Sequence, residues 1–281
     1  MTSKPPTANF YTLKQVDLVQ RACLTLATYL GSYLDDVVVV GGLVPSLLMP
    51  ADRLKEGQEA HVGTIDLDLG LSLALLEESR YIELVSQLKK AGFAPDVTKK
   101  GKPANHRWKH RNEPITVDFL IEPLQPGVTQ NRFKVVDEDL SALEAEALPL
   151  AFKDRERVVL VGNTLGNEKA TRELWVCRPG AFIVLKALAF KGRGENKDAY
   201  DLLYVLRNYG TNYIEDVAAA MRPLLDDPVT KKALDVLKAD FTDPAATGPK
   251  RAAEFSFRTA DDAYRADLAG AVTELLRLLG H

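Results

Sequence analysis

The sequence predicts an α/β (α+β) fold, in which a mixed-sheet lobe (residues 1–178) is followed by a helical lobe (residues 179–281). Two observations support this prediction. Up to residue 178, apolar runs and period-two alternation, both typical of strands, recur between helical segments. From Pro179 onward, apolar residues recur at helical spacing, and breaks rich in Gly, Pro and Asp separate the helical segments.

Composition narrows the class of protein. The chain has 281 residues and a formal net charge of −3. This charge excludes a nucleic-acid-binding protein whose whole surface is basic, but it allows a local basic patch. Cys23 and Cys177 have neither metal-ligand nor disulfide-framework spacing, and the four histidines predict no zinc site. The stretch "MTSKPPTANFYTLKQ" lacks the apolar core expected of a signal peptide, and no apolar run reaches transmembrane length. We therefore expect a cytoplasmic enzyme or binding protein that does not enter a membrane.

Helices and strands alternate in the first lobe. In chain order, the pattern predicts an amphipathic helix at 12–34, a buried strand at 37–40 that breaks at Gly41–Gly42, a short helix at 43–50, a strand at 63–71 and a helix at 79–92 ending at Gly92. It then predicts a hairpin at 107–123 whose second arm is a strand at 115–121, a polar, acidic segment at about 122–155, and strands at 156–163 and 172–177.

Helices dominate the second lobe. The predicted helices lie at 180–192, 197–208, 212–224, 228–239 and 260–279, and "DPAATGPK" (243–250) predicts an exposed loop.

The strand "GTIDLDLGL" (63–71) contains two carboxylates. Because side chains alternate along a strand, Asp66 and Asp68 project from one face while leucines occupy the other. Asp118 lies in a second strand, "ITVDFLI", and all three carboxylates can converge if these strands are neighbours. Two such charges about 4 Å apart repel by roughly 4 kcal/mol at an effective dielectric near 20. A divalent cation such as Mg²⁺ or Mn²⁺ bound between the carboxylates would replace this repulsion by a net attraction. A two-metal site could support phosphoryl transfer.

The glycine pair upstream indicates a phosphate site. Gly41 and Gly42 directly follow a buried strand, so their backbone N–H groups can approach a phosphate, and the helix that follows adds its positive N-terminal end. Ser46 could contribute a hydroxyl.

Together these motifs resemble the polymerase-β-like nucleotidyltransferase superfamily. The downstream segment "RPGAFIVLKALAFKGRGENKDAYDLLYVL" is similar to the AbiEii/AbiGii toxin nucleotidyltransferases of bacterial toxin–antitoxin systems, since a lysine in an apolar helix precedes a basic loop and Lys-Asp-x-x-Asp-Leu. The resemblance covers roughly residues 37–208. Many relatives carry an arginine four residues before the first aspartate, where this chain has Val62, and His61 or Arg53 could substitute.

The resemblance implies roles for the matching residues. Those implied to hold the nucleotide are Gly41, Gly42, Ser46, Thr64 and Lys186. Those implied to hold metal are Asp66, Asp68 and Asp118. Lys186 would contact phosphate, and Asp198 would act near the acceptor or orient Lys186, with Asp201 behind it. Deprotonation of the acceptor could fall to Asp118, to Asp198 or to a hydroxyl whose pKa the metal lowers.

The resemblance also implies a function. It implies a Mg²⁺-dependent toxin that moves a nucleoside monophosphate from an NTP to RNA, in particular a tRNA 3′ end, and so blocks translation until a cognate antitoxin restrains it. A small-molecule nucleotidyltransferase of the antibiotic-modifying type and a degenerate module that binds nucleotide without turnover remain alternatives.

A basic segment is the candidate RNA contact. The residues concerned are Lys99, Lys100, Lys102, Arg107, Trp108, Lys109 and Arg111, with Arg193 in the second lobe. Cations around an aromatic side chain can grip a nucleic-acid backbone and stack a base. A solvated hairpin with charged edges would have the same composition. Likewise, Asp66 and Asp68 could lie on a solvated strand face, and Lys186 could be a surface lysine with a buried stem.

Overall fold

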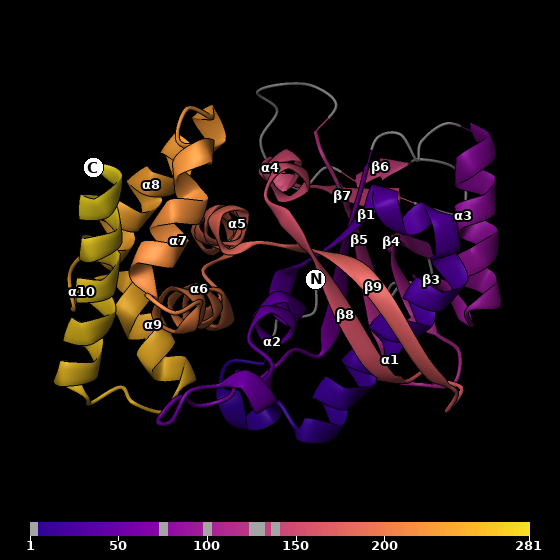
Figure 1. Ribbon diagram of the computed structural model, residues 1–281, viewed down its shortest axis with the longest axis horizontal. Coiled ribbons are helices and arrows are strands. Elements are labelled where there is room, and N and C mark those ends of the chain that lie inside the picture. Colours follow the sequence, from indigo (N-terminus) through magenta and orange to yellow (C-terminus); the bar gives the residue numbers. More distant parts are fainter. Residues whose placement is uncertain (1–4, 73–77, 98–102, 124–132, 136–140) are drawn as a thin grey trace. The chain divides into compact units, whose positions relative to one another are not determined.

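Figure 1 shows a computed structural model of the chain, which describes residues 5–72, 78–97, 103–123, 133–135 and 141–281. The chain forms two compact units. The sheet unit comprises residues 13–47 and 63–177, and the helical unit comprises residues 1–12, 48–62 and 178–281. The predicted α/β class, with a helical C-terminal region, is confirmed. The change at residue 178 coincides with the predicted boundary, but segments 1–12 and 48–62 group with the helices.

A mixed sheet forms the centre of the sheet unit. Its strands are β1 (Val37–Val40), β2 (Asp66–Leu71), β3 (Phe93–Val97), β4 (Pro103–His110), β5 (Thr116–Ile121), β6 (Phe133–Val135), β7 (Ser141–Glu144), β8 (Arg155–Asn163) and β9 (Lys169–Cys177). The main strand order is β3-β4-β5-β2-β1-β9-β8, and β7 pairs with β5 and β6. β2 is antiparallel to β1 but parallel to β5, so β2 and β5 point the same way at the centre of the sheet.

Apolar faces fix the central strands. All four valines of β1 are buried, as a strand covered on both faces requires. In β2 the leucines Leu67, Leu69 and Leu71 are buried on one face, which leaves Asp66 and Asp68 on the other, as predicted. α1 (Leu13–Leu30) packs against β8 and β9, and it also contacts α3 (Glu78–Lys90) (Figure 1).

Several elements of the sheet unit differ from the prediction. β3 contains Pro95 and was not predicted; it tolerates the proline because it is an edge strand whose register shifts between Pro95 and Asp96. The polar segment at 122–155 includes β7 and α4 (Leu148–Lys153), whose Leu148 and Leu150 are buried. Short apolar segments of this kind fall below the length at which periodicity is informative.

Helices make up most of the helical unit. They are α5 (Pro179–Arg193), α6 (Asn196–Asn208), α7 (Ile214–Met221), α8 (Pro228–Phe241), α9 (Thr247–Phe255) and α10 (Asp262–Leu279). The short helix α2 (Val44–Leu48) belongs to the sheet unit except for its last residue. Local chemistry starts and stops these helices. Asp227 and Asp261 accept backbone N–H bonds at the first turns of α8 and α10. Gly194, at φ 63°, ends α5 in the left-handed conformation.

The expected exposed loop at 243–250 is wrong in its second half. α9 starts at Thr247, and both Gly248 and Pro249 are buried. Proline is acceptable in the first turn of a helix, where its missing N–H has no helical partner. Gly248 allows close packing, because a Cβ there would lie 2.3 Å from the Phe241 ring. The Gly-Pro pair therefore marks a tight helix start rather than a loop.

None of the helices in the described ranges is both long and apolar enough to cross a bilayer.

Candidate functional site

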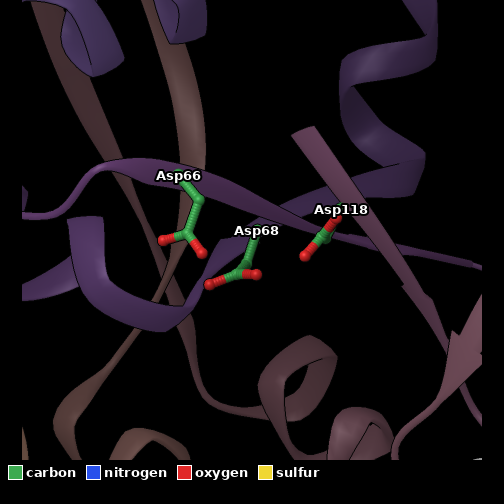
Figure 2. Close-up of side chains that lie close together, drawn as sticks. All are labelled: Asp66, Asp68 and Asp118. Carbon is green, nitrogen blue, oxygen red and sulfur yellow. The ribbon is translucent and has the colours of Figure 1, made fainter. Parts of the chain in front are cut away.

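Three carboxylates meet on the central strands of the sheet unit. Asp66 and Asp68 lie on β2 and Asp118 on β5, and one ligand oxygen from each lies within 4.8 Å of the other two (Figure 2). The parallel register sets Asp68 directly beside Asp118 and Asp66 beside Thr116. The convergence expected from the sequence is therefore present. It arises because the two strands are neighbours and both aspartates of β2 share a face.

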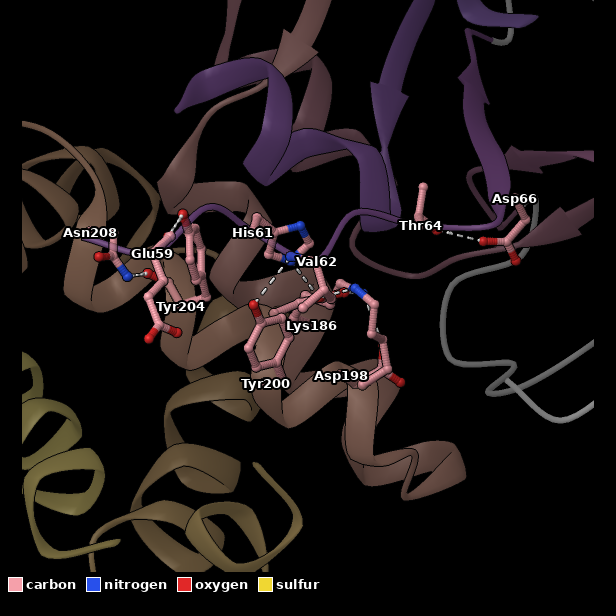
Figure 3. Close-up of polar contacts among 12 residues, drawn as sticks. Glu59, His61, Val62, Thr64, Asp66, Lys186, Asp198, Tyr200, Tyr204 and Asn208 are labelled. Atoms are coloured by element: carbon pink, nitrogen blue, oxygen red, sulfur yellow. Dashed lines mark hydrogen bonds and ion pairs between the residues drawn. The ribbon is translucent and has the colours of Figure 1, made fainter. Parts of the chain in front are cut away.

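Thr64 orients the first carboxylate. Its Oγ1 donates a hydrogen bond of 2.8 Å to Asp66 Oδ1, and both side chains are buried (Figure 3). A buried carboxylate with a fixed donor has one of its oxygens held in place and its orientation set. Thr64 thus supports Asp66, and the nucleotide contact expected for it stays a prediction.

The glycine turn lies directly against these residues. Gly41 has φ 71°, and a Cβ built on it would lie 2.0 Å from Asp68 Oδ2. A Cβ on Gly42 would lie 2.6 Å from Thr64 Oγ1. Only glycine fits at both positions, so the turn keeps backbone, not side chains, beside the carboxylates. Ser46, also predicted here, is half-buried in α2.

Arg107 is the cationic neighbour of the carboxylates. From β4, its Nε donates to Asp118 Oδ1 at 2.6 Å and its Nη2 donates to Asp118 Oδ2 at 2.5 Å. These hydrogen bonds raise the pKa of the guanidinium, as do the charges of Asp118, Asp66 and Asp68. Its side chain is 20% exposed and bound to a carboxylate, so Arg107 is part of this site, and the RNA contact expected for it stays a prediction.

The residues present fit a hard divalent cation. The donors are carboxylate oxygens, which Mg²⁺ and Mn²⁺ prefer. A second observation also fits a cation: position 41 carries no side chain, and any Cβ there would lie against Asp68 Oδ2. All three carboxylates are candidate ligands, and a cation that binds Asp118 would share its oxygens with Arg107.

Lys186 lies in a second polar cluster, within the helical unit. It projects from α5 toward α6, where its Nζ lies 3.0 Å from Asp198 Oδ1 and 2.7 Å from Asp201 Oδ2 (Figure 3). The lysine side chain is 4% exposed and both carboxylates are fully buried. The alternative of a surface lysine is therefore wrong, and the three residues that the sequence grouped together are in contact.

Asp201 is the hub of this cluster. Besides Lys186, it binds Lys197 Nζ and His61 Nε2, the latter at 2.9 Å from Asp201 Oδ1. Burial by itself would raise the pKa of Asp201, but Lys186, Lys197 and the bond to His61 outweigh it and hold the pKa well below its usual range. Burial and the charge of Lys197 lower the pKa of His61 to about 4. At neutral pH, His61 is thus uncharged and donates its Nε2–H to an ionised Asp201.

Asp198 is held from two sides. Arg193 Nε and Nη2 donate to its two oxygens at 2.6 and 2.7 Å, and Lys186 shares Oδ1. Asp198 has no exposed surface. Both oxygens are bonded to cations, so a proton from an acceptor could reach either oxygen only after an ion pair opens.

The candidate RNA residues are mostly placed differently from the expectation. Lys99, Lys100 and Lys102 lie outside the described residues. The expectation that Trp108 stacks on a base is wrong, because its side chain is fully buried and meets Phe119 edge-on. Arg107 and Arg193 are bound to aspartates. Lys109 and Arg111 are exposed.

Sequence patterns could have predicted the aspartate contacts of two residues, Lys197 and Arg107. Lys197 precedes Asp201 by four residues on one helix, the spacing of an intrahelical ion pair. Arg107 precedes the buried Trp108, and strand alternation turns it to the opposite face. His61 was considered only as a substitute near the carboxylates of 63–71, yet it binds Asp201. Arg53, the other substitute, is exposed.

Comparisons with known proteins add no family assignment. No family model matches the chain, and no curated protein sequence matches it.

Proposed function

We propose that the protein is a metal-dependent nucleotidyltransferase whose metal centre is formed by Asp66, Asp68 and Asp118. The observation that carries the proposal is the convergence of the three carboxylates beside Gly41 and Gly42. Carboxylate oxygens suit the cation, and a side-chain-free turn suits the phosphates of a nucleotide. The resemblance to AbiEii/AbiGii toxins points to the same chemistry from the order of the motifs.

In the proposed reaction, an acceptor hydroxyl oxygen attacks the α-phosphorus of an NTP and releases its proton to solvent. The bond from that phosphorus to the oxygen bridging the β-phosphate breaks, and pyrophosphate leaves. Bound Mg²⁺ would neutralise phosphate charge in this step. Within the chain, Asp66 and Asp68 provide metal-ligand oxygens, Thr64 holds Asp66 in its orientation, and Gly41 keeps the approach open.

Lys186 is the residue that the resemblance implies for phosphate contact, and its two aspartates fix its ammonium group. The proposed acceptor is RNA, in particular a tRNA 3′ end, and the proposed partner is a cognate antitoxin. Both proposals come from the resemblance. We also propose a cytoplasmic location, which comes from the composition of the chain.

A second candidate function is nucleotide binding without turnover. The observation that favours it is the double hydrogen bond from Arg107, which engages both oxygens of the third carboxylate. A chain of this kind would bind NTP with Mg²⁺ and release it unchanged.

One experiment separates these functions. The purified chain is incubated with Mg²⁺, each labelled NTP and either total tRNA or aminoglycosides. We expect the label to follow RNA, and Asp66→Asn to abolish transfer while the melting temperature stays near that of the wild type. Asp96→Asn, a matched change on edge strand β3, should retain activity. Label on aminoglycosides would favour the antibiotic-modifying class. An active Asp66→Asn variant contradicts the proposal, and binding without transfer favours the second candidate.

A further inference from the structure

Arg107, Asp118 and Asp68 lie side by side across three neighbouring strands. The register pairs Arg107 of β4 with Asp118 of β5, and Asp118 with Asp68 of β2. The row continues on the next strand, where Val40 of β1 pairs with Asp68 and Gly41 follows. The Arg107 guanidinium thus lies at one end of this row, and the proposed cation position, beside Asp68 and Gly41, lies toward the other end.

The Arg107 guanidinium engages both oxygens of the Asp118 carboxylate. Two nearly parallel N–H···O bonds, of 2.6 and 2.5 Å, use one lone pair on each oxygen of Asp118. The ligand oxygens of Asp66 and Asp68 lie within 4.8 Å of that of Asp118, so the guanidinium charge acts on these carboxylates as well. The arginine is therefore a counter-ion to all three acids, although it makes its hydrogen bonds to Asp118.

We propose that Arg107 is the built-in counter-ion of the metal centre and competes with the divalent cation for Asp118. This inference rests on the metal site of the proposed function. Without a cation, the guanidinium offsets the repulsion among the three carboxylates and so stabilises the fold. With a cation bound by Asp66 and Asp68, the same positive charge opposes binding and holds back the third ligand.

A purely structural cross-strand ion pair predicts something different. If Arg107 only tied β4 to β5, its loss would lower the stability of the sheet unit and would leave cation affinity unchanged or reduced. A counter-ion has effects of opposite sign: its loss lowers the melting temperature of the metal-free chain and raises affinity for the cation. This difference in sign is the measurable consequence.

The test is Mn²⁺ binding to the full chain without nucleotide, measured by calorimetry and by loss of the free Mn²⁺ electron paramagnetic resonance signal. Arg107→Gln should bind Mn²⁺ about tenfold more tightly than the wild type, or better, and should melt at a lower temperature without metal. Arg111→Gln is the matched control, since Arg111 is exposed just beyond the end of β4. It should bind Mn²⁺ as the wild type does.

A second pair of variants covers the case in which Arg107→Gln does not fold. Asp118→Asn leaves the guanidinium with Asp66 and Asp68 as its acidic neighbours, so Mn²⁺ binding should weaken at least about tenfold. The double variant Arg107→Gln/Asp118→Asn removes both charges, and its affinity should recover above that of Asp118→Asn alone. No recovery in the double variant contradicts the proposal.

The outcomes distinguish this inference from the proposed function. Unchanged or weaker Mn²⁺ binding by Arg107→Gln overturns the counter-ion role, whether or not the chain transfers nucleotides. Tighter binding in a chain that transfers no nucleotide supports the counter-ion and overturns the transferase. If neither the wild type nor any variant binds Mn²⁺, both are overturned.

Discussion

Replacing His61 by glutamine should change how the stability of the helical unit depends on pH. His61 is buried beside Asp201 and stacks on Tyr200, with ring centroids 5.3 Å apart. Burial, followed by the charge of Lys197, lowers its pKa from 6.5 to about 4. As pH falls below 6.5, the unfolded chain therefore takes up a proton that the folded chain refuses, and the folded state loses stability.

The expected size follows from that pKa difference. The pKa falls by about 2.5 units, and about 1.4 kcal/mol per unit gives roughly 3 kcal/mol. This stabilisation is complete above pH 6.5 and is lost progressively between pH 6.5 and about 4. Asp201 acts in a different window: its depressed pKa gives stability that is present above its ordinary value of 3.8 and lost only at lower pH. Within the helical unit we therefore assign the loss between pH 6.5 and 4.5 to His61. His106 and His110, whose pKa values burial also lowers, lie in the sheet unit.

The assay is urea unfolding at a series of pH values, with two signals. Both tryptophans, Trp108 and Trp175, lie in the sheet unit, so their fluorescence follows that unit, while far-UV circular dichroism reports chiefly on the helices. His61→Gln should flatten the dichroism-derived unfolding free energy between pH 6.5 and 4.5. His281→Gln, at the exposed C-terminus, should keep the wild-type slope. Equal slopes for the wild type and His61→Gln would refute this reasoning.

Two further predictions use matched controls. Lys186→Met leaves two buried carboxylates short of a partner and should destabilise the helical unit by about 3–5 kcal/mol. Lys191→Met, on the same helix but 63% exposed, should change the free energy of unfolding by less than about 0.5 kcal/mol. Similar urea midpoints for the two variants would contradict the stabilising role of the buried cluster. Gly41→Ala and Gly57→Ala both strain a positive-φ position at a cost of about 1–2 kcal/mol, but only the first adds a Cβ against Asp68, so only it should weaken Mn²⁺ binding. Equal Mn²⁺ affinities in that pair would show that the glycine turn does not shape the site.

The central strands were predictable because period and burial agree there. The four valines of β1 and the alternating leucines of β2 each allow one arrangement, and that arrangement places Asp66 and Asp68 together. The proximity of Asp118 was conditional, since nothing local states which strands become neighbours. Strand order depends on long-range packing, which a single sequence does not reveal.

The errors have physical causes of the same kind. Trp108 looks like a binding residue amid cations, but alternation in β4 buries it and turns Arg107 to the carboxylate face. His61 is near Asp66 in the sequence but belongs to a segment that packs with the helices. Gly248 reads as a loop residue until Phe241 is placed against it. In each case the deciding partner is distant in sequence or on the other face of the element.

The central claim is that Asp66 and Asp68 hold a divalent cation beside the glycine turn. Its most direct test is a crystal structure of the wild-type chain grown with Mn²⁺, with an anomalous difference map calculated at a wavelength sensitive to manganese. We predict a peak within coordination distance of both carboxylates and next to Gly41. A map without a peak there, with the carboxylates ordered and Asp118 still bound to Arg107, would contradict the account.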